Sequence, residues 1–474
     1  MTGITVSDIA RITGGRLSGN GDAAVSSAVI DSREASEGSM FLALPGEKAD
    51  GHSYIGKAFE MGAACCLALR VPDGETRPVI VVPDVAAALK DLAEQYRARF
   101  DIPVVGIAGS VGKTTAKEMT AAVLGSRLNV LKTEKNLNNE LGVPLTLLRL
   151  APEHQAAVVE MGISDFGEMS RLAKMVRPDM AVYTVIGHAH LEKLGDRNGV
   201  LRAKTELVDF MPAGGTVFVN GDDDLLYGYE CSRKKLCFGT GGHNDVRAEN
   251  IVSDDSGTRC DIAAGSRRIP AVIQAYGQHM VYAALAGASV GIKLGLTDEE
   301  IASGIASYRT VGRRASVLDT GFVTLIDDCY NANPDSMKCA LDSMAKLSGR
   351  KVCILGDMLE LGGNSPALHR AVGEYAAENG AGLIMTVGPM AENISAGAVG
   401  KGVRSEHFST VEELISALPG CLRAGDTVLV KASHSMEMAS AGHWAAQEPQ
   451  DRQSSLITKA IVKPPYVFGP FGPL

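Results

Sequence analysis

The chain has 474 residues, of which 45% are hydrophobic and 21% charged, a composition typical of a soluble globular protein with several hydrophobic cores. Its 46 basic and 55 acidic residues give a net charge of −9 without a basic block, which argues against nucleic-acid binding. The N-terminus lacks a signal-peptide pattern, and no apolar run has the roughly 18–20 residues of a membrane span. The nine cysteines lack zinc-ligand spacing. We expect a cytoplasmic protein without stable membrane insertion.

The first 100 residues predict a small α/β domain. Apolar segments at 28–30, 40–44, 65–69 and 79–82 have the length of buried strands, and 54–61 and 85–100 have helical spacing. Two polar clusters lie between them, Asp31-Ser32-Arg33 and Asp50-Gly51-His52. Turn chemistry alone leaves open whether these clusters are surface turns or parts of a binding site.

The segment 104–115 is the most informative stretch of the chain. An apolar strand at 104–108 is followed by the turn Gly109-Ser110-Val111-Gly112 and by a helix that begins near Lys113-Thr114-Thr115. Such a turn lets backbone N–H groups approach phosphate, the lysine adds a full charge, and a threonine hydroxyl suits Mg²⁺. Ile107 stands where the usual P-loop pattern has its first glycine. The context of strand, turn and helix nevertheless predicts binding of a nucleoside triphosphate.

From 101 to 310 the pattern alternates between strands and helices. Strands are predicted at 156–160, 181–185 and 215–219, with helices at 139–148, 166–175 and 200–210. This alternation predicts a mostly parallel sheet covered on both faces, with ligands at the carboxyl ends of its strands.

Polar side chains follow two of these strands. Glu160 ends one strand and is placed to hold Mg²⁺, although a plain strand-end acid remains an alternative. His188 and His190 follow the next strand. Taken alone, Lys204 fits a solvated helix lysine.

Residues 311–446 predict a third α/β unit. Its strands are expected at 323–327, 352–355, 383–387 and 427–430, with helices at 336–346, 367–378 and 411–418 between them, again a doubly wound pattern. Residues 447–474 are rich in proline and show no helical or strand period, so we expect a flexible or atypical tail.

By its motifs the chain resembles the ATP-dependent Mur ligases, over about residues 1–440. The motifs occur in the family's order, and the asparagine-rich stretches are the most specific of them. They comprise the two N-terminal clusters above, the P-loop, Asn136-Leu137-Asn138-Asn139 with Gly142-Val143-Pro144-Leu145-Thr146-Leu147-Leu148, Glu160-Met161-Gly162, Ala189-His190-Leu191-Glu192, Ala203-Lys204-Thr205-Glu206, Gly312-Arg313, Tyr330-Asn331-Ala332-Asn333-Pro334-Asp335-Ser336-Met337 and Gly356-Asp357-Met358.

The resemblance implies three domains: a UDP-substrate domain (1–100), a central P-loop ATPase-type domain (101–310) and a C-terminal Rossmann-like domain (311–446). It implies an ATP-dependent ligase, most similar to those that join D-alanyl-D-alanine to UDP-N-acetylmuramoyl-tripeptide. The tripeptide carboxylate would attack ATP to form an acyl phosphate, and the dipeptide amine would then displace phosphate. ATP and two Mg²⁺ ions are the implied cofactors, and we expect a monomer.

The resemblance also assigns roles to residues. Lys113 would contact the β- and γ-phosphates, Thr114 and Glu160 would hold one Mg²⁺, and His190 with a carbamoylated Lys204 would help to hold a second. The remaining implied site residues are Gly109, Ser110, Val111, Gly112, Thr115, Asn138, Asn139, Arg313, Asp328, Tyr330 and Asn331 around the nucleotide or acyl phosphate, and Ser32, Arg33, Asp50 and His52 near the UDP group.

The chain departs from the family pattern at several positions. Gln278-His279-Met280 and Ala283 stand where asparagines are frequent, and Lys431-Ala432-Ser433-His434 replaces a Lys-Gly-Ser-Arg pattern. Three alternatives stay open at this point: another Mur-type amino acid ligase, a folylpolyglutamate synthetase-like enzyme, and an ATP-binding relative or P-loop switch without ligase chemistry. The N-terminal domain argues against the folate enzyme.

Overall fold

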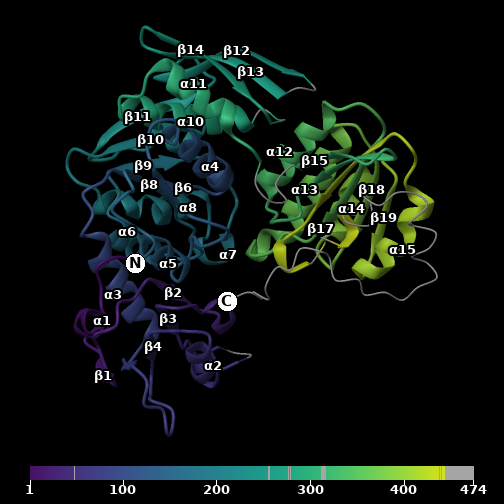
Figure 1. The fold of residues 1–474 in the computed structure, drawn as a ribbon. Helices are drawn as coiled ribbons and strands as arrows, with labels where there is room; N and C mark the ends of the chain where they lie inside the picture. Colours follow the sequence, from purple (N-terminus) through teal and green to yellow (C-terminus); the bar gives the residue numbers. More distant parts are fainter. Residues whose placement is uncertain are drawn as a thin grey trace.

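The computed structural model describes residues 1–46, 49–254, 257–275, 277, 279–310, 316–436, 438 and 440–442. Three β-sheets follow one another along the chain, and each has its own helices (Figure 1). The sheets span residues 16–81, 104–273 and 316–431, so each falls within one of the three predicted segments. The tail at 447–474 and Arg313 lie outside the described residues.

The N-terminal sheet has the strand order β1-β5-β4-β3-β2. Strand β1 is antiparallel to β5, and the other neighbours are parallel. The four predicted strands are confirmed, while the first strand and the first helix were not predicted. The elements are α1 (Val6–Thr13), β1 (Arg16–Ser18), β2 (Ser27–Val29), η1 (Ser32–Glu34), β3 (Ser39–Leu42), η2 (Gly51–Tyr54), α2 (Ile55–Glu60), β4 (Cys65–Ala68) and β5 (Val79–Val81).

Helix α3 (Val85–Arg97) joins the N-terminal sheet to the central one. Its apolar side chains belong to a core that continues from the first sheet into the helices of the second. Tyr96 on this helix is fully buried; its hydroxyl donates to the carbonyl of Leu150 (2.8 Å) and accepts from the N–H of Thr2 (2.8 Å). The guanidinium of Arg97 donates to the carbonyl of Val176 (3.2 Å). This helix therefore ties the first two units into one body.

The central sheet has nine strands in the order β14-β13-β12-β11-β10-β9-β6-β8-β7. Its strands are parallel from β7 to β12, as predicted, and the antiparallel strands β13 and β14 extend it at one edge. That extension was not predicted, although the alternating burial of β14 is typical of a half-buried strand. The strands are β6 (Val104–Ala108), β7 (Val130–Lys132), β8 (Ala156–Glu160), β9 (Met180–Tyr183), β10 (Thr216–Asn220), β11 (Lys234–Gly239), β12 (Val246–Asp254), β13 (Gly257–Ala264) and β14 (Arg267–Ile273).

The position of β6 between β8 and β9 decides where the site forms. All five residues of β6 are buried, and it is hydrogen-bonded to both neighbours. The turn after β6 therefore lies between the ends of β8 and β9. The helices around this sheet are α4 (Lys113–Leu124), α5 (Gly142–Leu147), α6 (Glu168–Val176), α7 (Leu191–Leu194), α8 (Arg197–Thr205), η3 (Glu206–Phe210), α9 (Asp224–Gly228), α10 (His279–Lys293) and α11 (Asp298–Ser307).

The C-terminal sheet has six strands in the order β15-β16-β20-β17-β18-β19, parallel except for the edge pair β15 and β16. Its four predicted strands are confirmed. Within the described residues, no helix has the length and apolar character to span a bilayer. The elements are β15 (Ser316–Asp319), β16 (Val323–Asp327), α12 (Pro334–Ala345), β17 (Lys351–Gly356), η4 (Gly362–Asn364), α13 (Ser365–Glu378), β18 (Ala381–Val387), α14 (Glu392–Gly400), β19 (Ser405–Phe408), α15 (Val411–Cys421), β20 (Asp426–Lys431) and η5 (His434–Met436).

The buried hydroxyl of Tyr96 leads to a stability prediction. Tyr96→Phe leaves the Leu150 carbonyl and the Thr2 N–H without their partner, so we expect a loss of about 1–2 kcal/mol in the free energy of unfolding, measured by urea denaturation. Tyr54→Phe is the control, because Tyr54 is exposed and its change should fall within about 0.5 kcal/mol. Equal effects of the two substitutions would contradict the role of the buried hydroxyl.

Candidate functional site

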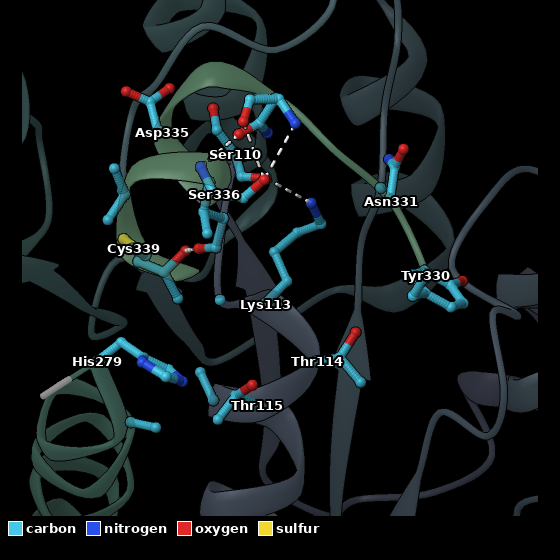
Figure 2. A pocket seen from close by; sticks show the side chains of 18 of the residues that line it. Ser110, Lys113, Thr114, Thr115, His279, Tyr330, Asn331, Asp335, Ser336 and Cys339 are labelled. Atoms are coloured by element: carbon cyan, nitrogen blue, oxygen red, sulfur yellow. Dashed lines mark hydrogen bonds between the residues drawn. The ribbon is translucent and has the colours of Figure 1, made fainter. Parts of the chain in front are cut away.

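A cleft of about 980 Å³ lies between the central and C-terminal sheets. The turn after β6, the ends of β8 and β9 and the start of α10 form one wall. The loop 328–333 and helix α12 form the other, so both domains contribute side chains to the same space (Figure 2).

The turn after β6 is shaped by glycines at two positions where a side chain is disfavoured. Gly109 has a φ of +147°, and a Cβ there would lie 2.0 Å from the Thr184 hydroxyl oxygen. Gly112 has a φ of +83° and precedes helix α4. The ammonium of Lys113 donates to the carbonyl of Gly109 (2.9 Å) and so lies over the turn. Backbone N–H groups at a helix start, together with this cation, form a site for phosphate groups.

The buried carboxylate of Glu160 lies beside this turn. Glu160 is 1% exposed, and it accepts hydrogen bonds from the Thr114 hydroxyl (2.9 Å) and from the side-chain amide of Asn138 (2.8 Å). Its backbone N–H donates to the Thr133 hydroxyl (3.0 Å). The structure thus brings together three side chains that the sequence placed at this site, from β8, α4 and the loop before α5.

The donor set around Glu160 fits Mg²⁺. A hydroxyl and a carboxylate are hard oxygen ligands, and Mg²⁺ is commonly held by one or two carboxylates together with water and phosphate oxygens. Across the part of the chain that the structure describes, no group of three or more His, Cys, Asp and Glu side chains is arranged to hold a metal ion. The Thr114 hydroxyl and the Glu160 carboxylate therefore fit a Mg²⁺ ion whose remaining ligands would include phosphate oxygens of the substrate.

His190 lines the cleft at the start of α7 and faces the C-terminal domain. Its φ is +57°, and its Nδ1 lies 2.5 Å from a carboxylate oxygen of Glu360. The imidazole holds the pKa of the Glu360 carboxyl below its usual range. Its role as a Mg²⁺ ligand stays a prediction.

Lys204 is buried near the end of α8, 1% exposed, and not on the surface as its sequence position alone suggested. Burial, reinforced by the nearby charge of Lys113, lowers its pKa well below the ordinary value of 10.5. Lys117 is a second buried lysine, but its ammonium is paired with Glu118 (2.7 Å) and donates to the Thr133 carbonyl (2.6 Å). Among the described residues we find no such partner for the Lys204 amine. The structure therefore favours a neutral amine at Lys204.

The C-terminal domain contributes Asp328, Tyr330 and Asn331 to the opposite wall, as the sequence predicted. Lys431 is 2% exposed; its ammonium lies 2.5 Å from Asp328 and donates to the Asn331 carbonyl (2.9 Å). The ring of Tyr330 lies 5.6 Å from that of His434. The residue pattern that replaces Lys-Gly-Ser-Arg thus still supplies a buried cation beside the cleft.

Most of the predicted residues come together here. Among the described residues that were predicted near the nucleotide, all except Gly109 and Lys204 line the cleft. Arg313 lies outside the described residues. The members that line it are Ser110, Val111, Gly112, Lys113, Thr114, Thr115, Asn138, Asn139, Glu160, His190, Asp328, Tyr330 and Asn331.

The four residues predicted near a UDP group lie in the N-terminal domain and do not line this cleft. Ser32 and Arg33 follow strand β2, while Asp50 and His52 follow its parallel neighbour β3, so all lie at the carboxyl edge of this sheet. The Nδ1 of His52 donates to Asp50 (2.6 Å), and its Nε2 accepts the N–H of Leu69 (3.0 Å). These bonds fix the loop, and the substrate role stays a prediction.

The sequence missed three residues of this region. Thr184 donates to the Val111 carbonyl (2.6 Å) and supports the turn from β9; its place at a strand end was a usable signal. Asp335 belongs to the motif at 330–337 but was given no role, and Glu360 was not singled out. Both contact the central domain, and no local pattern indicates contacts that form only between domains.

Three family models match the chain in succession: the Mur ligase family catalytic domain at residues 25–97, the Mur ligase middle domain at 107–291 and the Mur ligase glutamate ligase domain at 313–434. The UDP-N-acetylmuramoyl-tripeptide–D-alanyl-D-alanine ligase of Bacillus subtilis (strain 168) is 35% identical over 444 residues, which are 92% of this chain and 96% of that protein.

Solved structures are similar over almost the whole chain. MurF from Acinetobacter baumannii matches with a TM-score of 0.85 and 30% identity, over 94% of this chain and 99% of that one. MurF ligase from Thermotoga maritima, solved in complex with ADP, matches with a TM-score of 0.78 and 27% identity, over 90% and 98%.

The buried amine of Lys204 gives a pH dependence of stability. Its folded pKa is lowered, so between that pKa and 10.5 the unfolded chain binds one more proton, and this lysine's contribution to stability rises with pH. Relative to Lys204→Met, the wild-type free energy of unfolding should rise by at most about 1.4 kcal/mol per pH unit in that window. Urea unfolding at several pH values, with carbon dioxide excluded, measures this. Parallel pH curves would show that Lys204 stays charged when folded.

Proposed function

We propose, from the premise that this chain belongs to the Mur ligase family, that it is an ATP-dependent ligase joining D-alanyl-D-alanine to UDP-N-acetylmuramoyl-tripeptide. The products are the UDP-muramoyl-pentapeptide precursor of peptidoglycan, ADP and phosphate. The observation that carries the proposal is the cleft in which Lys113, Thr114 and Glu160 of one domain face Asp328, Tyr330 and Asn331 of another. A ligase needs such a space, because three substrates must meet in it.

The first step is phosphoryl transfer to the tripeptide carboxylate. This chemistry depends mostly on positioning and on neutralising charge, which the N–H groups at the start of α4 and the Lys113 ammonium supply. Thr114 and Glu160 would hold Mg²⁺, which would neutralise charge on the phosphates. The carboxylate oxygen attacks the γ-phosphorus, the bond to the β-phosphate oxygen breaks, and ADP leaves.

The second step forms the peptide bond. A carboxylate is a poor electrophile, so an acyl phosphate divides one difficult reaction into two easier ones. The dipeptide amine attacks the acyl carbon, phosphate leaves with the bonding electron pair, and the amine gives up a proton. Water must be excluded meanwhile, which the second wall of the cleft, formed by 328–333 and α12, favours.

A second Mg²⁺ would use His190 and a carbamoylated Lys204. A neutral amine reacts with carbon dioxide whereas an ammonium does not, so the lowered pKa of Lys204 supports this modification. The carbamate would replace a cation by an anionic oxygen donor. The nearby ammonium of Lys113 would stabilise that anion.

The N-terminal domain would hold the UDP group through Ser32, Arg33, Asp50 and His52, and Arg313 would contact the nucleotide or acyl phosphate. We propose a monomer that acts in the cytoplasm without membrane insertion. Another Mur-type amino acid ligase, or a silent relative, is not favoured, because relatives named for this reaction match nearly the whole chain.

The reaction itself is tested by phosphate release, omitting one component at a time. Release should require ATP, Mg²⁺, the UDP-linked tripeptide and D-alanyl-D-alanine together, with the pentapeptide product seen by mass spectrometry. Release that continues without D-alanyl-D-alanine would indicate another acceptor or an uncoupled ATPase. Absence of release despite ATP binding would contradict an active ligase.

The role of Lys113 gives a second test. Lys113→Ala removes the cation over the phosphate turn, so we expect kcat to fall by at least about a hundredfold. Lys174→Ala is the matched control, because Lys174 is an exposed lysine on helix α6 of the same domain and pairs with Glu94. Unchanged turnover of the Lys113 variant would remove this lysine from the mechanism.

A further inference from the structure

The segment 186–188, directly after strand β9, is held by three different parts of the protein. Three successive backbone N–H groups each donate to a side-chain oxygen: Ile186 to Asp223 (2.9 Å), Gly187 to Ser110 (3.0 Å) and His188 to Asp335 (2.6 Å). Asp223 and Ser110 belong to the central domain, and Ser110 lies in the phosphate turn. Asp335 belongs to the other domain, in the first turn of α12.

Asp335 approaches this segment so closely that a side chain at position 187 would have to displace its carboxylate. A Cβ on Gly187 would lie 2.2 Å from a carboxylate oxygen of Asp335, and its three nearest neighbours would all be atoms of Asp335. The same carboxylate lies 3.1 Å from the Nδ1 of His188. The Asp335 carboxylate therefore accepts the backbone N–H of His188, lies beside the His188 imidazole, and occupies the space that a side chain on residue 187 would need.

The C-terminal domain makes a second contact a few residues further on. The Glu360 carbonyl accepts the N–H of Glu192 (3.2 Å), and the Glu360 carboxylate pairs with His190. The C-terminal domain thus holds the segment 186–192 at His188 and again at His190 and Glu192. The start of this segment is bonded to the phosphate turn through Ser110. The segment therefore connects the phosphate turn to helix α12, through the Gly187–Ser110 and His188–Asp335 hydrogen bonds.

We propose that Asp335 is a positioning residue for phosphoryl transfer, and this inference rests on the proposed ligase function. When the C-terminal domain closes, Asp335 accepts the His188 N–H and completes the row of three bonds. The row fixes Gly187 against Ser110 and holds His190 toward the cleft. Closure of one domain therefore sets the geometry of the phosphate turn in the other.

Three variants separate this role from a general loss of structure. Asp335→Ala removes the acceptor, whereas Asp335→Asn keeps a carbonyl oxygen that can still accept the His188 N–H. Gly187→Ala disrupts the same contact from the central domain, because its methyl group would occupy the position of the Asp335 carboxylate. Glu374→Gln is the control, because Glu374 is a partly exposed acid on α13 of the same domain and pairs with Arg370.

The first measurement is hydrogen–deuterium exchange of the amides of 186–188, with and without ATP and Mg²⁺. In Asp335→Ala the His188 amide should exchange at least about tenfold faster, while Ile186 and Gly187 stay slow on bonds within their own domain. Asp335→Asn and Glu374→Gln should match the wild type. This measurement needs no tripeptide or dipeptide, so it tests the contact even if the proposed ligase reaction fails.

The second measurement is turnover in the complete ligase assay. For Asp335→Ala and Gly187→Ala we expect kcat to fall by about ten- to a hundredfold with the KM for ATP changed less than about threefold, and Asp335→Asn should recover most of the loss. Because both substitutions break one contact, the double variant should lose no more than the worse single variant.

Three results would overturn the proposal. A raised KM for ATP, equal in Asp335→Ala and Asp335→Asn, would show that Asp335 contacts the nucleotide directly. Unchanged His188 exchange and unchanged kcat in Asp335→Ala would show that the contact has no role. If Asp335→Ala does not fold, Gly187→Ala decides: normal kcat in that variant would also overturn the proposal.

Discussion

A charged carboxylate buried at the end of a central strand is the constraint on which this site depends. Glu160 is almost completely buried. Because a buried charge without partners costs several kcal/mol, its carboxylate must be hydrogen-bonded. Thr114 and Asn138 supply those bonds, from the helix after the phosphate turn and from the loop before α5. One acid thus fixes the relative positions of three segments and places oxygen donors beside Lys113, where the phosphates of ATP would lie.

Among the described residues, Lys204 is a buried lysine without a charged partner. Lys117 and Lys204 are both buried, but Lys117 has a carboxylate and a carbonyl, whereas the Lys204 amine has neither among the described residues. The charged form of Lys204 is therefore disfavoured, and its neutral amine is the form that reacts with carbon dioxide. A conventional helix sequence around Lys204 gives no hint of this environment, which arises from the strands and helices that cover α8.

The two walls of the cleft differ in what holds them. The central wall is rigid, because β6 is hydrogen-bonded on both sides and α3 joins its core to the first domain. The C-terminal wall meets it around 186–192 through the polar contacts of Asp335 and Glu360, and Leu368 of the C-terminal domain packs against the core of the first two domains. Polar contacts of this kind can form and break without disturbing either core, which suits a site that must admit three substrates and then exclude water.

The sequence alone determined the three α/β units, most strands and the phosphate turn, because these follow from short-range patterns: apolar runs, glycines before a helix, and acids at strand ends. It also placed Thr114, Asn138 and Glu160 at one site through their motifs. Only the tertiary structure decided that Lys204 is buried, that the central sheet extends into the antiparallel strands β13 and β14, and that Asp335 meets Gly187 and His188. The reason is physical: burial, strand pairing and contacts between domains depend on residues far apart in the chain, and no local pattern records them.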